Sequence, residues 1–403
     1  MRIVDADSHF MEPLGWFQES FPELASRCPA VPLVDMVLEA LMGDLVTSLP
    51  PGLSLGARDL LPQGLLDMLD RWDDMEQLNA SDTGETRDRV DEMQAARGWS
   101  PAQYEGKARL AWADKKGIDV QVMLPTLGYM PYRAAMQQGL REIAFEALAA
   151  YNTWAAHQLE GCTDRLIPVS LVDLGDLEWS LAEIQRMRAL GSRVVQIRAE
   201  PAGGKSLAHP DFERFWSTVV DLDMTIMLHV GGGRAAVDPG WIDNGGHPMD
   251  FSLMYNAFVR RLVPELALSA LILRGVPERH PKLRFIVSEL GTHWIPGFLS
   301  RLDAGVERSK SATGGMSDDF DHLKLQPSEY FQRQVRVSVL ASEPGLDGIM
   351  RRSPEGVLVF SSDYPHPEGT REPKKIFDDL LAESDTHTRE QFYGESLAAL
   401  MGI

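Results

Sequence analysis

The residues of this chain best suited to do chemistry are carboxylates and imidazoles that follow short apolar runs. They are Asp7 and His9, His229, Glu289 with His293, and Asp363 with His366. Side chains of these types are the usual ligands of protein-bound transition metals. Repeated strands that each end on such a residue are typical of a parallel barrel with its site at the carboxyl ends of the strands. The pattern therefore predicts metal chemistry.

The first of these groups has the sequence VDADSHFME. Asp7 and His9 are two positions apart, so on a strand both side chains leave from the same face and can converge on one ion. Without a metal, Asp7 would cap a turn and His9 would lie in a hydrogen-bonded polar core. Glu12 follows three residues later, where it is either a further ligand or a helix-capping acid.

Two further groups end strands that read as buried on both faces. His229 ends MTIMLH, and Glu289 ends RFIVSE. A carboxylate at such a depth must be paired or metal-bound, because burying it alone costs several kcal/mol. His293 falls in the first turn of the following helix, where it either points back to the same region or is exposed.

The segment VLVFSSDYPHPEG carries the strongest single signal. Asp363 follows an apolar strand and precedes two prolines that restrict the loop, so its position is fixed. His366 is a ligand, a proton shuttle or a hydrogen-bonding partner of a ligand, and we favour the last two roles.

Eight short runs rich in apolar and β-branched residues are candidate strands. They are Ile3-Val4, Ile118–Leu124, Leu166–Val172, Arg193–Ile197, Met224–His229, Leu283–Val287, Val335–Val339 and Val357–Phe360. Most are followed by a segment with helical periodicity, such as Leu177–Leu190. Eight strand and helix units predict a (β/α)8 TIM barrel formed by residues 1–403 as a single domain.

Two connections are longer than a barrel needs. Residues 10–110 are expected to form an insertion that caps the barrel mouth. The segment 231–255 begins GGGR, and its glycines either let backbone approach a substrate or form turns. Residues 371–403 are expected to form a C-terminal helical element used for packing or for a homo-oligomer.

Composition excludes several classes of function. Apolar residues make up 44% and charged residues 24% of the 403 positions, as in ordinary globular proteins. The formal net charge of -20 repels nucleic acid and anionic membranes, so neither is an expected partner. Two cysteines without CxxC spacing exclude a disulfide framework or zinc ribbon. The absence of an apolar leader or a membrane-length segment favours a cytoplasmic protein.

Four segments carry a family resemblance, namely VDADSHFMEP, MLHVGG, VSELGTHWIPGFLSRLD and FSSDYPHPEG. Together they resemble the amidohydrolase-related metal-dependent TIM-barrel family that includes the aminocarboxymuconate semialdehyde decarboxylases. The resemblance runs from the first strand to the last. It implies that His9, His229 and Asp363 are metal ligands.

The chain also departs from the usual pattern of that family. Asp7 stands where the family has the first residue of His-x-His, and Glu289 stands where it has a histidine. The fourth strand offers Arg198 and no lysine for a carboxylated bridge between two zinc ions. A ligand set rich in carboxylates favours iron or manganese over zinc. This variant resembles the non-haem di-iron monooxygenases of the family, typified by the hydroxylase of platensimycin and platencin diterpenoid biosynthesis.

From this resemblance we expect a monooxygenase that holds two iron ions per chain. It would hydroxylate a bulky apolar acid or its CoA thioester, for example a diterpenoid in antibiotic biosynthesis. The expected metal ligands are Asp7, His9, Glu12, His229, Glu289, His293 and Asp363, the Glu12 and His293 side chains completing the second ion, with His366 as the catalytic residue. Electrons would come from an external donor, because no flavin or dinucleotide motif is present.

The alternative is a hydrolase or non-oxidative decarboxylase with one divalent ion such as zinc or manganese. A third hypothesis is a catalytically silent barrel that binds an acyl ligand. Candidate contacts to CoA phosphates are Lys205, Arg234, Arg260 and Arg261, and the aromatic residues of the mouth loops are Phe10, Trp16, Phe17, Trp241, Tyr255 and Trp294. Both sets are equally compatible with ordinary surface or packing roles.

Overall fold

The computed structural model describes residues 1–13, 15–29, 100–230, 258, 260–312, 320–366 and 372–403. Most of the expected 10–110 insertion and the whole 231–255 loop lie outside this part of the chain. Arg234, Trp241, Tyr255, Arg371 and the side chain of Arg260 lie outside it as well.

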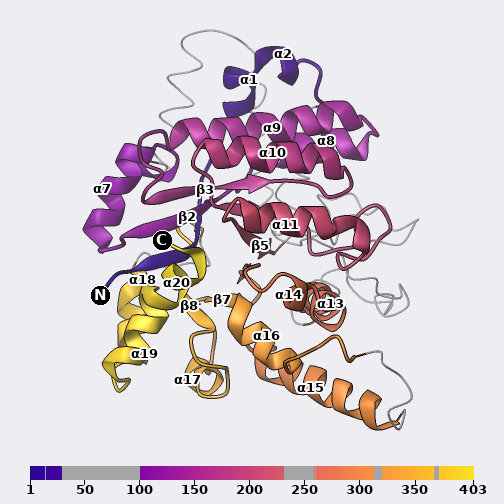
Figure 1. The fold of residues 1–403 in the computed structure, drawn as a ribbon. Helices are drawn as coiled ribbons and strands as arrows, with labels where there is room; N and C mark the ends of the chain where they lie inside the picture. The colour runs from indigo at the N-terminus through magenta and orange to yellow at the C-terminus, as the bar shows by residue number, and fades with distance from the viewer. Residues whose placement is uncertain (14, 30–99, 231–257, 259, 313–319, 367–371) are drawn as a thin grey trace, which may run out of the picture.

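Eight parallel strands form the centre of the molecule, and each is hydrogen-bonded to the next in chain order (Figure 1). They are β1 (Val4–His9), β2 (Val120–Leu124), β3 (Leu166–Leu171), β4 (Val194–Gln196), β5 (Thr225–His229), β6 (Phe285–Ser288), β7 (Val335–Val339) and β8 (Leu358–Phe360). Every strand lies in a run predicted from the sequence or overlaps one, because strands buried on both faces read as continuous apolar runs.

The first strand meets the segment that follows the last one, which brings the sheet round into a barrel. The amide of His9 donates to the carbonyl of Tyr364 at 2.7 Å, and the amide of Asp363 donates to the carbonyl of Asp7 at 2.9 Å. Ser8 and Tyr364 form a parallel bridge at the same place. The predicted (β/α)8 TIM barrel is confirmed.

Helices separate the strands and cover the outside of the barrel (Figure 1). Those of the first half are α1 (Trp16–Ser20), α2 (Pro22–Ala25), η2 (Pro101–Gln103), α7 (Gly106–Lys116), α8 (Met130–Gln137), α9 (Arg141–Gln158), α10 (Leu177–Ala189), η3 (Pro210–Phe212) and α11 (Glu213–Asp221). Those of the second half are α13 (Arg260–Leu273), α14 (Val276–Arg279), α15 (Ile295–Ala312), α16 (Pro327–Gln334), α17 (Leu346–Met350), α18 (Pro373–Leu380), α19 (Thr386–Glu390), the π-helical η6 (Gln391–Glu395) and α20 (Ser396–Met401).

The C-terminal helical element packs against the first and last strands. Phe377 of α18 and Tyr393 of η6 lie with their ring centroids 5.6 Å from that of Phe360 in β8. Gly394 lies against the backbone of Arg2, so that a Cβ at this position would come within 2.3 Å of the Arg2 carbonyl oxygen. This close approach requires glycine, and it fixes the end of the chain beside its beginning.

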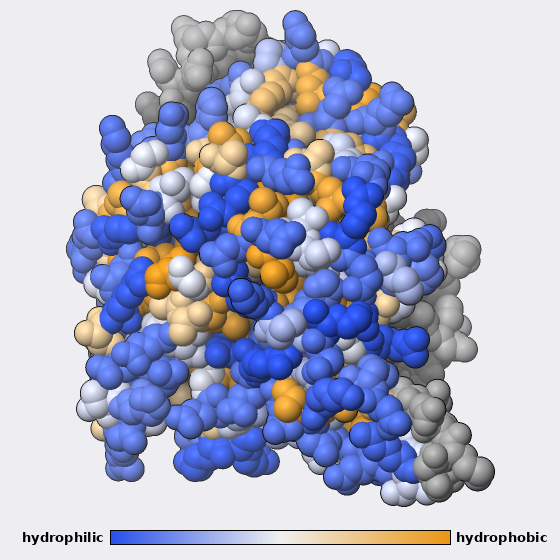
Figure 2. Space-filling view, viewed as in Figure 1, coloured by the Kyte–Doolittle hydropathy of each residue, from blue (hydrophilic) through white to orange (hydrophobic). Residues whose placement is uncertain are grey.

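The face of the molecule seen in Figure 2 is mostly hydrophilic, with apolar side chains scattered among charged ones. This agrees with the net charge of -20. Among the described helices, none is both long enough and apolar enough to cross a membrane.

Candidate metal centre

Five of the residues singled out by sequence converge at the carboxyl ends of the strands. His9 is the last residue of β1 and His229 is the last residue of β5. Glu289 directly follows β6, Asp363 follows β8 by three residues, and Asp7 lies within β1. Their side chains are at most 9% exposed. Active sites of TIM barrels are found at this end of the strands.

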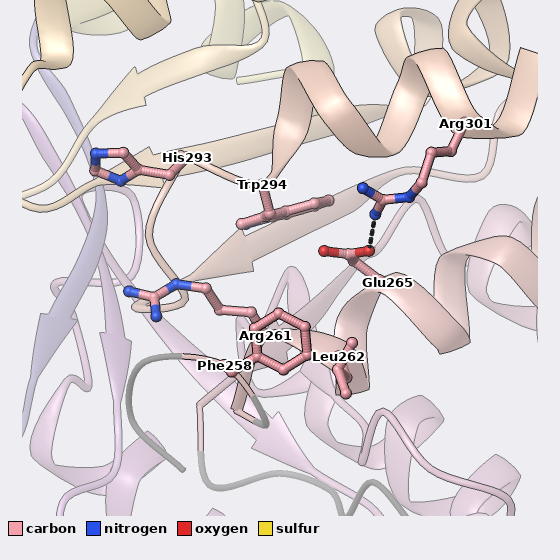
Figure 3. Close-up of a pocket in the computed structure, with 7 residues that line it drawn as sticks. All are labelled: Phe258, Arg261, Leu262, Glu265, His293, Trp294 and Arg301. Atoms are coloured by element: carbon pink, nitrogen blue, oxygen red, sulfur yellow. Dashed lines mark hydrogen bonds and ion pairs between the residues drawn. The ribbon is translucent and has the colours of Figure 1, made fainter. Parts of the chain in front are cut away.

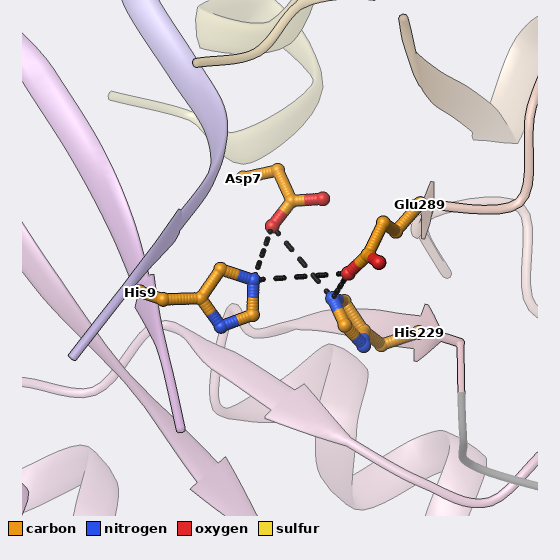
Figure 4. Close-up of side chains that lie close together, drawn as sticks. All are labelled: Asp7, His9, His229 and Glu289. Carbon is orange, nitrogen blue, oxygen red and sulfur yellow. Dashed lines mark ion pairs between the residues drawn. The ribbon is translucent and has the colours of Figure 1, made fainter. Parts of the chain in front are cut away.

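Four of these side chains form a first cluster, shown in Figure 4. The Nε2 atom of His9 lies 3.1 Å from Oδ1 of Asp7 and 4.0 Å from Oε2 of Glu289. The Nε2 atom of His229 lies 3.7 Å from the same Asp7 oxygen and 3.1 Å from the same Glu289 oxygen. All four ligand atoms lie within 4.8 Å of one another, which is close enough to surround one ion.

A second cluster shares His9 and Glu289 with the first and adds Asp363 and His366. Oδ1 of Asp363 lies 3.6 Å from Nε2 of His9 and 3.0 Å from Nδ1 of His366. The rings of His9 and His366 are 3.9 Å apart between centroids. Three carboxylates and three imidazoles therefore meet at one end of the barrel.

Backbone carbonyls orient the two strand-end histidines. Nδ1 of His9 lies 2.9 Å from the carbonyl oxygen of Pro125, and Nδ1 of His229 lies 2.9 Å from that of Val230. A carbonyl only accepts, so each Nδ1 carries a proton and each Nε2 faces the cluster. Metal-ligating histidines are oriented in this way by a hydrogen bond to their other nitrogen.

Several polar atoms at the centre are buried and have no hydrogen-bond partner within the described part of the chain. They are both carboxylate oxygens of Asp7, Nε2 of His9, Nε2 of His229 and Oδ2 of Asp363. Buried polar atoms are almost always satisfied, so a group of unsatisfied ones pointing at a common region indicates a missing partner. Lone pairs on oxygen and imidazole nitrogen fit a divalent cation.

The electrostatics of the first cluster also favour positive charge. Burial alone would raise the pKa of Asp7, yet the nearby His229 and His9 rings hold that pKa well below its usual range. Burial alone would lower the pKa of His229, yet Asp7 and Glu289 hold it well above its usual range. In this state a proton on His229 balances two carboxylates. A metal ion bound there would displace that proton.

Two backbone conformations at the centre are uncommon for residues other than glycine. Glu289 has φ of 59° and Asp363 has φ of 51°. Left-handed backbone at such residues costs of the order of 1 to 3 kcal/mol and is found where a site requires it. Here the turn after each strand directs a carboxylate into the cluster.

His366 connects Asp363 to a threonine hydroxyl. Its Nδ1 lies 3.0 Å from Oδ1 of Asp363, and its Nε2 lies 2.8 Å from Oγ1 of Thr126. The Thr126 hydroxyl also lies 2.6 Å from the carbonyl oxygen of Phe10 and donates to it, so it accepts from His366. Nε2 of His366 therefore carries a proton. When the pair of Asp363 and His366 is neutral overall, it holds a second proton between Nδ1 of His366 and the Asp363 carboxylate.

Glu12 lies in another environment and belongs to neither cluster. Its carboxylate accepts a hydrogen bond from the amide of Leu127 at 2.8 Å and others from the amide of Thr126 at 3.2 and 3.4 Å. The side chain is fully buried, and burial raises its pKa to about 7 despite these hydrogen bonds. The structure thus differs from our expectation of a ligand, because the loop after β2 takes up this carboxylate.

His293 also belongs to neither cluster. Its Nε2 lies 2.9 Å from the carbonyl oxygen of Pro344, and its Nδ1 lies 3.5 Å from Oε2 of Glu343. The side chain is 42% exposed and lines a pocket beside the centre. It precedes α15, so the expected position at a helix start is nearly right, but the ring contacts Pro344 and Glu343 in place of a ligand cluster.

Sequence reasoning missed a buried polar network beneath the centre. Asp5 accepts from the amide of Ser362 at 2.8 Å, from the Ser362 hydroxyl at 2.6 Å and from Nε2 of Gln121 at 2.8 Å. Gln121 in turn accepts from Nε of Arg109 at 2.8 Å. These bonds join β1, β2, α7 and the loop after β8. Of these residues, only Asp5 could have been suspected from the sequence, because it precedes Asp7 by two positions on the same strand.

Arg109 is a fully buried cation that holds two site loops by their backbone. It donates to the carbonyl oxygen of His9 at 3.2 Å and to that of Tyr364 at 3.3 Å. Its guanidinium lies 4.6 Å from the ring centroid of Tyr364, which stacks on Trp112 at 3.9 Å. A lone arginine in a charged helix gives no signal of this role.

The aromatic residues expected at the mouth mostly pack in the core. Phe10 and Trp16 each lie 5.4 Å between ring centroids from Trp154 of α9, and Phe17 is buried beside Trp16. Trp294 alone of the described ones lines the pocket next to the centre. The first three therefore fix the loop after β1 against α9.

Comparison with known proteins gives a family and a fold. A family model described as amidohydrolase matches residues 4–396. An amidohydrolase structure from Mycobacterium avium subsp. paratuberculosis K-10 is 19% identical, with a TM-score of 0.66 over 100% of this chain and 99% of that one. The 5-carboxyvanillate decarboxylase of Sphingomonas paucimobilis is 18% identical, with a TM-score of 0.60 over 100% and 99%.

A further similar structure contains a metal. The 5-carboxyvanillate decarboxylase of Novosphingobium aromaticivorans DSM 12444, complexed with manganese and 4-hydroxy-3-methoxy-5-nitrobenzoic acid, is 18% identical, with a TM-score of 0.61. The alignment covers 100% of this chain and 96% of that one. At these identities the likeness to solved structures establishes the fold. With nearly the whole length matched by the family model, the chain belongs to the amidohydrolase family.

Proposed function

We propose that this protein is a metal-dependent enzyme that removes carbon dioxide from an organic acid without oxidation. One observation carries the proposal: buried oxygen and nitrogen atoms of Asp7, His9, His229 and Asp363 face a common region without hydrogen-bond partners. A metal centre explains them. Several of the similar structures are decarboxylases, which supports this choice over hydrolysis as an analogy at the level of fold.

Asp7, His9, His229 and Glu289 would hold a divalent ion, with Asp363 at its edge. Such an ion supplies Lewis acidity toward a carboxylate or carbonyl oxygen. The residues behind it keep the ligands in place, because Pro125 and Val230 fix the two imidazoles by their carbonyls. Manganese, zinc and iron all accept this set of ligands.

The remaining chemistry of decarboxylation is a proton transfer to the carbon that loses carbon dioxide. The pair of Asp363 and His366 is the group of this chain that can hold that proton, at Nδ1 of His366 or on the carboxylate 3.0 Å away. Thr126 keeps the ring oriented by accepting from Nε2. The same pair could instead take a proton from water, which is the step that a hydrolase needs.

One observation favours the di-iron monooxygenase as a second candidate. The two clusters share His9 and Glu289. The Glu289 carboxylate has two oxygens and could serve two ions, whereas His9 would bind only one of them through Nε2. Oxygen-rich ligation suits iron. This candidate requires an external electron donor, and its expected substrate is a bulky apolar acid or its CoA thioester.

The deciding experiment measures metal and product together. The full chain is purified anaerobically, its metals are counted, and it is assayed with a panel of hydroxybenzoic acids for release of carbon dioxide without oxygen. We expect about one divalent ion per chain and carbon dioxide release that is lost in Asp7→Asn. Two irons per chain, with product formed only in the presence of oxygen and a reductant, would instead establish the monooxygenase.

A further inference from the structure

We propose that Arg109 is a positioning residue of the metal centre, which holds the end of β1 and the loop after β8 in the geometry that binds the ion. These two segments carry Asp7, His9 and Asp363. The inference rests on the metal centre of the proposed function and deepens it, but it does not depend on which reaction that centre catalyses. Among the described residues, Arg109 bonds to backbone oxygens and to the Gln121 amide, so it acts on the ligands through the backbone.

The guanidinium of Arg109 joins the two segments directly. Its Nη1 donates to the carbonyl oxygen of His9 at 3.2 Å and to that of Ala102 at 3.3 Å. Its Nη2 donates to the carbonyl oxygen of Tyr364 at 3.3 Å. The same Tyr364 oxygen accepts from the amide of His9 at 2.7 Å. One planar, fork-shaped cation therefore spans both segments at the point where the barrel closes.

A second branch runs from Arg109 through two side chains to the same segments. Nε of Arg109 donates to Oε1 of Gln121, and Nε2 of Gln121 donates to Oδ2 of Asp5, both at 2.8 Å. Oδ1 of Asp5 accepts from the amide of Ser362 at 2.8 Å and from that of Asp7 at 3.3 Å. Because arginine has donors and no acceptor, it fixes the orientation of the Gln121 amide.

The two branches hold both neighbours of Asp363. The amide and the hydroxyl of Ser362 donate to Asp5, and the carbonyl of Tyr364 accepts from Arg109. Asp363 itself has a left-handed φ of 51°, which is uncommon outside glycine and persists only where the surrounding structure holds it. Without the network this turn is free to relax, and the carboxylate that faces the centre would move with it.

The network is excluded from water. Arg109, Gln121 and Asp5 are all fully buried. Burial lowers the pKa of Arg109 to about 10, so the guanidinium stays charged at neutral pH. Packing alone would be served as well by an apolar side chain, because a buried charge costs free energy of desolvation. The carbonyls that the guanidinium holds therefore explain the arginine better than packing does.

The network reaches only one side of the centre. The other two ligands of the first cluster, His229 and Glu289, come from β5 and from the loop after β6. That loop continues to His293 and Trp294, which line a pocket of about 660 Å³ between α13 and α15 (Figure 3). The described lining belongs to these two helices and to the residues just before each, and includes no member of the network. A network variant should therefore change the metal centre and leave that pocket as it is.

Titration calorimetry of the chelator-treated full chain with Mn²⁺ tests the inference, together with thermal unfolding of the metal-free proteins. We expect Arg109→Met to weaken Mn²⁺ binding by about ten- to a hundredfold, the usual effect of losing a group that orients metal ligands. Arg109→Lys should restore part of the affinity, because one ammonium replaces the positive charge but not the fork of donors.

Arg336→Met is the matched control for a merely structural role. Arg336 is a half-buried arginine that donates to the carbonyls of Gln332 and Val335 near the start of β7, at the opposite end of the barrel. This variant should lower the Tm of the metal-free protein and leave the Mn²⁺ affinity unchanged.

Ser362→Ala is a second variant, for the case that Arg109→Met does not fold. It removes the 2.6 Å bond to Asp5 and the hydroxyl that accepts from the amide of Tyr364 at 3.1 Å. We expect it to weaken Mn²⁺ binding by about threefold or more. Ser361→Ala is its control and should bind as the wild type does, since the Ser361 hydroxyl donates to the carbonyl of Val339 outside the network.

The outcomes separate this inference from the proposed function. Folded network variants that bind Mn²⁺ as tightly as the wild type, or a loss in Arg336→Met as large as that in Arg109→Met, would overturn the inference alone. Weaker Mn²⁺ binding in the network variants of a protein that releases no carbon dioxide would overturn only the proposed function. A wild type that binds no Mn²⁺ would overturn both.

Discussion

At the scale of single residues, the roles of Asp363 and His366 can be separated from those of the metal-facing groups. We predict that His366→Gln lowers kcat by roughly 10²- to 10⁴-fold, the usual contribution of a general acid or base. The bound metal should be retained, because the four side chains of the first cluster are untouched. Metal content and kcat on the best acid of the hydroxybenzoate panel are the measurements.

His387→Gln is the control for this substitution, because His387 is an exposed histidine paired with Glu355 at 3.0 Å. It should leave both values unchanged. If His366→Gln loses the metal together with the activity, His366 is a ligand of the ion and not a carrier of protons.

The residues that could be predicted are those for which strand position decides the direction of the side chain. Asp7, His9 and His229 lie on strands, and the convergence of strand ends in a barrel brings them together. Glu12 and His293 lie in loops, where tertiary contacts decide the direction. The amides after β2 take up Glu12, and the carbonyl of Pro344 takes up His293.

At the scale of elements, the loop after β2 depends on a buried carboxylic acid. Burial raises the pKa of Glu12 from an ordinary 4.5 to about 7, so the folded chain keeps a proton that the unfolded chain releases between these values. The free energy of unfolding should therefore fall as the pH rises through this window, by up to about 3 kcal/mol. In Glu12→Gln this part of the pH dependence should be absent.

Urea unfolding at pH 5 and pH 7.5 measures the effect for the wild type, Glu12→Gln and Glu146→Gln. Glu146 is an exposed glutamate paired with Arg27, so its variant should follow the wild type. An identical pH dependence in all three proteins would show that Glu12 is ionised in the fold throughout.

Most of the fold was predictable because barrel strands bury both faces and so appear as apolar runs. Even β4, with only three residues, lies in the run Arg193–Ile197. The network of Arg109, Gln121 and Asp5 was not predictable, because most of its bonds join distant positions and leave no local period. Gln121 and Asp5 are 116 positions apart, and Arg109 and His9 are 100 apart.

At the scale of the whole molecule, bound metal should contribute to stability. Three carboxylates gather at one end of a chain with net charge -20, and a cation that binds only the folded state stabilises it. We predict that Mn²⁺ at about 100 times its Kd adds roughly 2.7 kcal/mol and raises the Tm of chelator-treated protein.

Thermal unfolding with and without Mn²⁺ measures this shift. Asp7→Asn should abolish the shift, because it removes a ligand at the centre of the first cluster. Asp223→Asn is the control, since Asp223 lies at the other end of β5 and pairs with Arg284 on the surface. An equal shift in Asp7→Asn would mean that manganese stabilises the protein at another site.

The meeting of β1 with the loop after β8 has a consequence for the synthesis of the chain. Asp5 and Ser362, which tie these segments together, are 357 positions apart. At the usual rate of translation, the ribosome needs roughly 20 to 70 seconds to make the intervening residues. For most of that time, the nascent chain contains Asp7 and His9 but neither Glu289 nor Asp363. We therefore expect the nascent chain to lack a complete set of ligands. The metal ion should then be selected and bound only after the whole chain has been made.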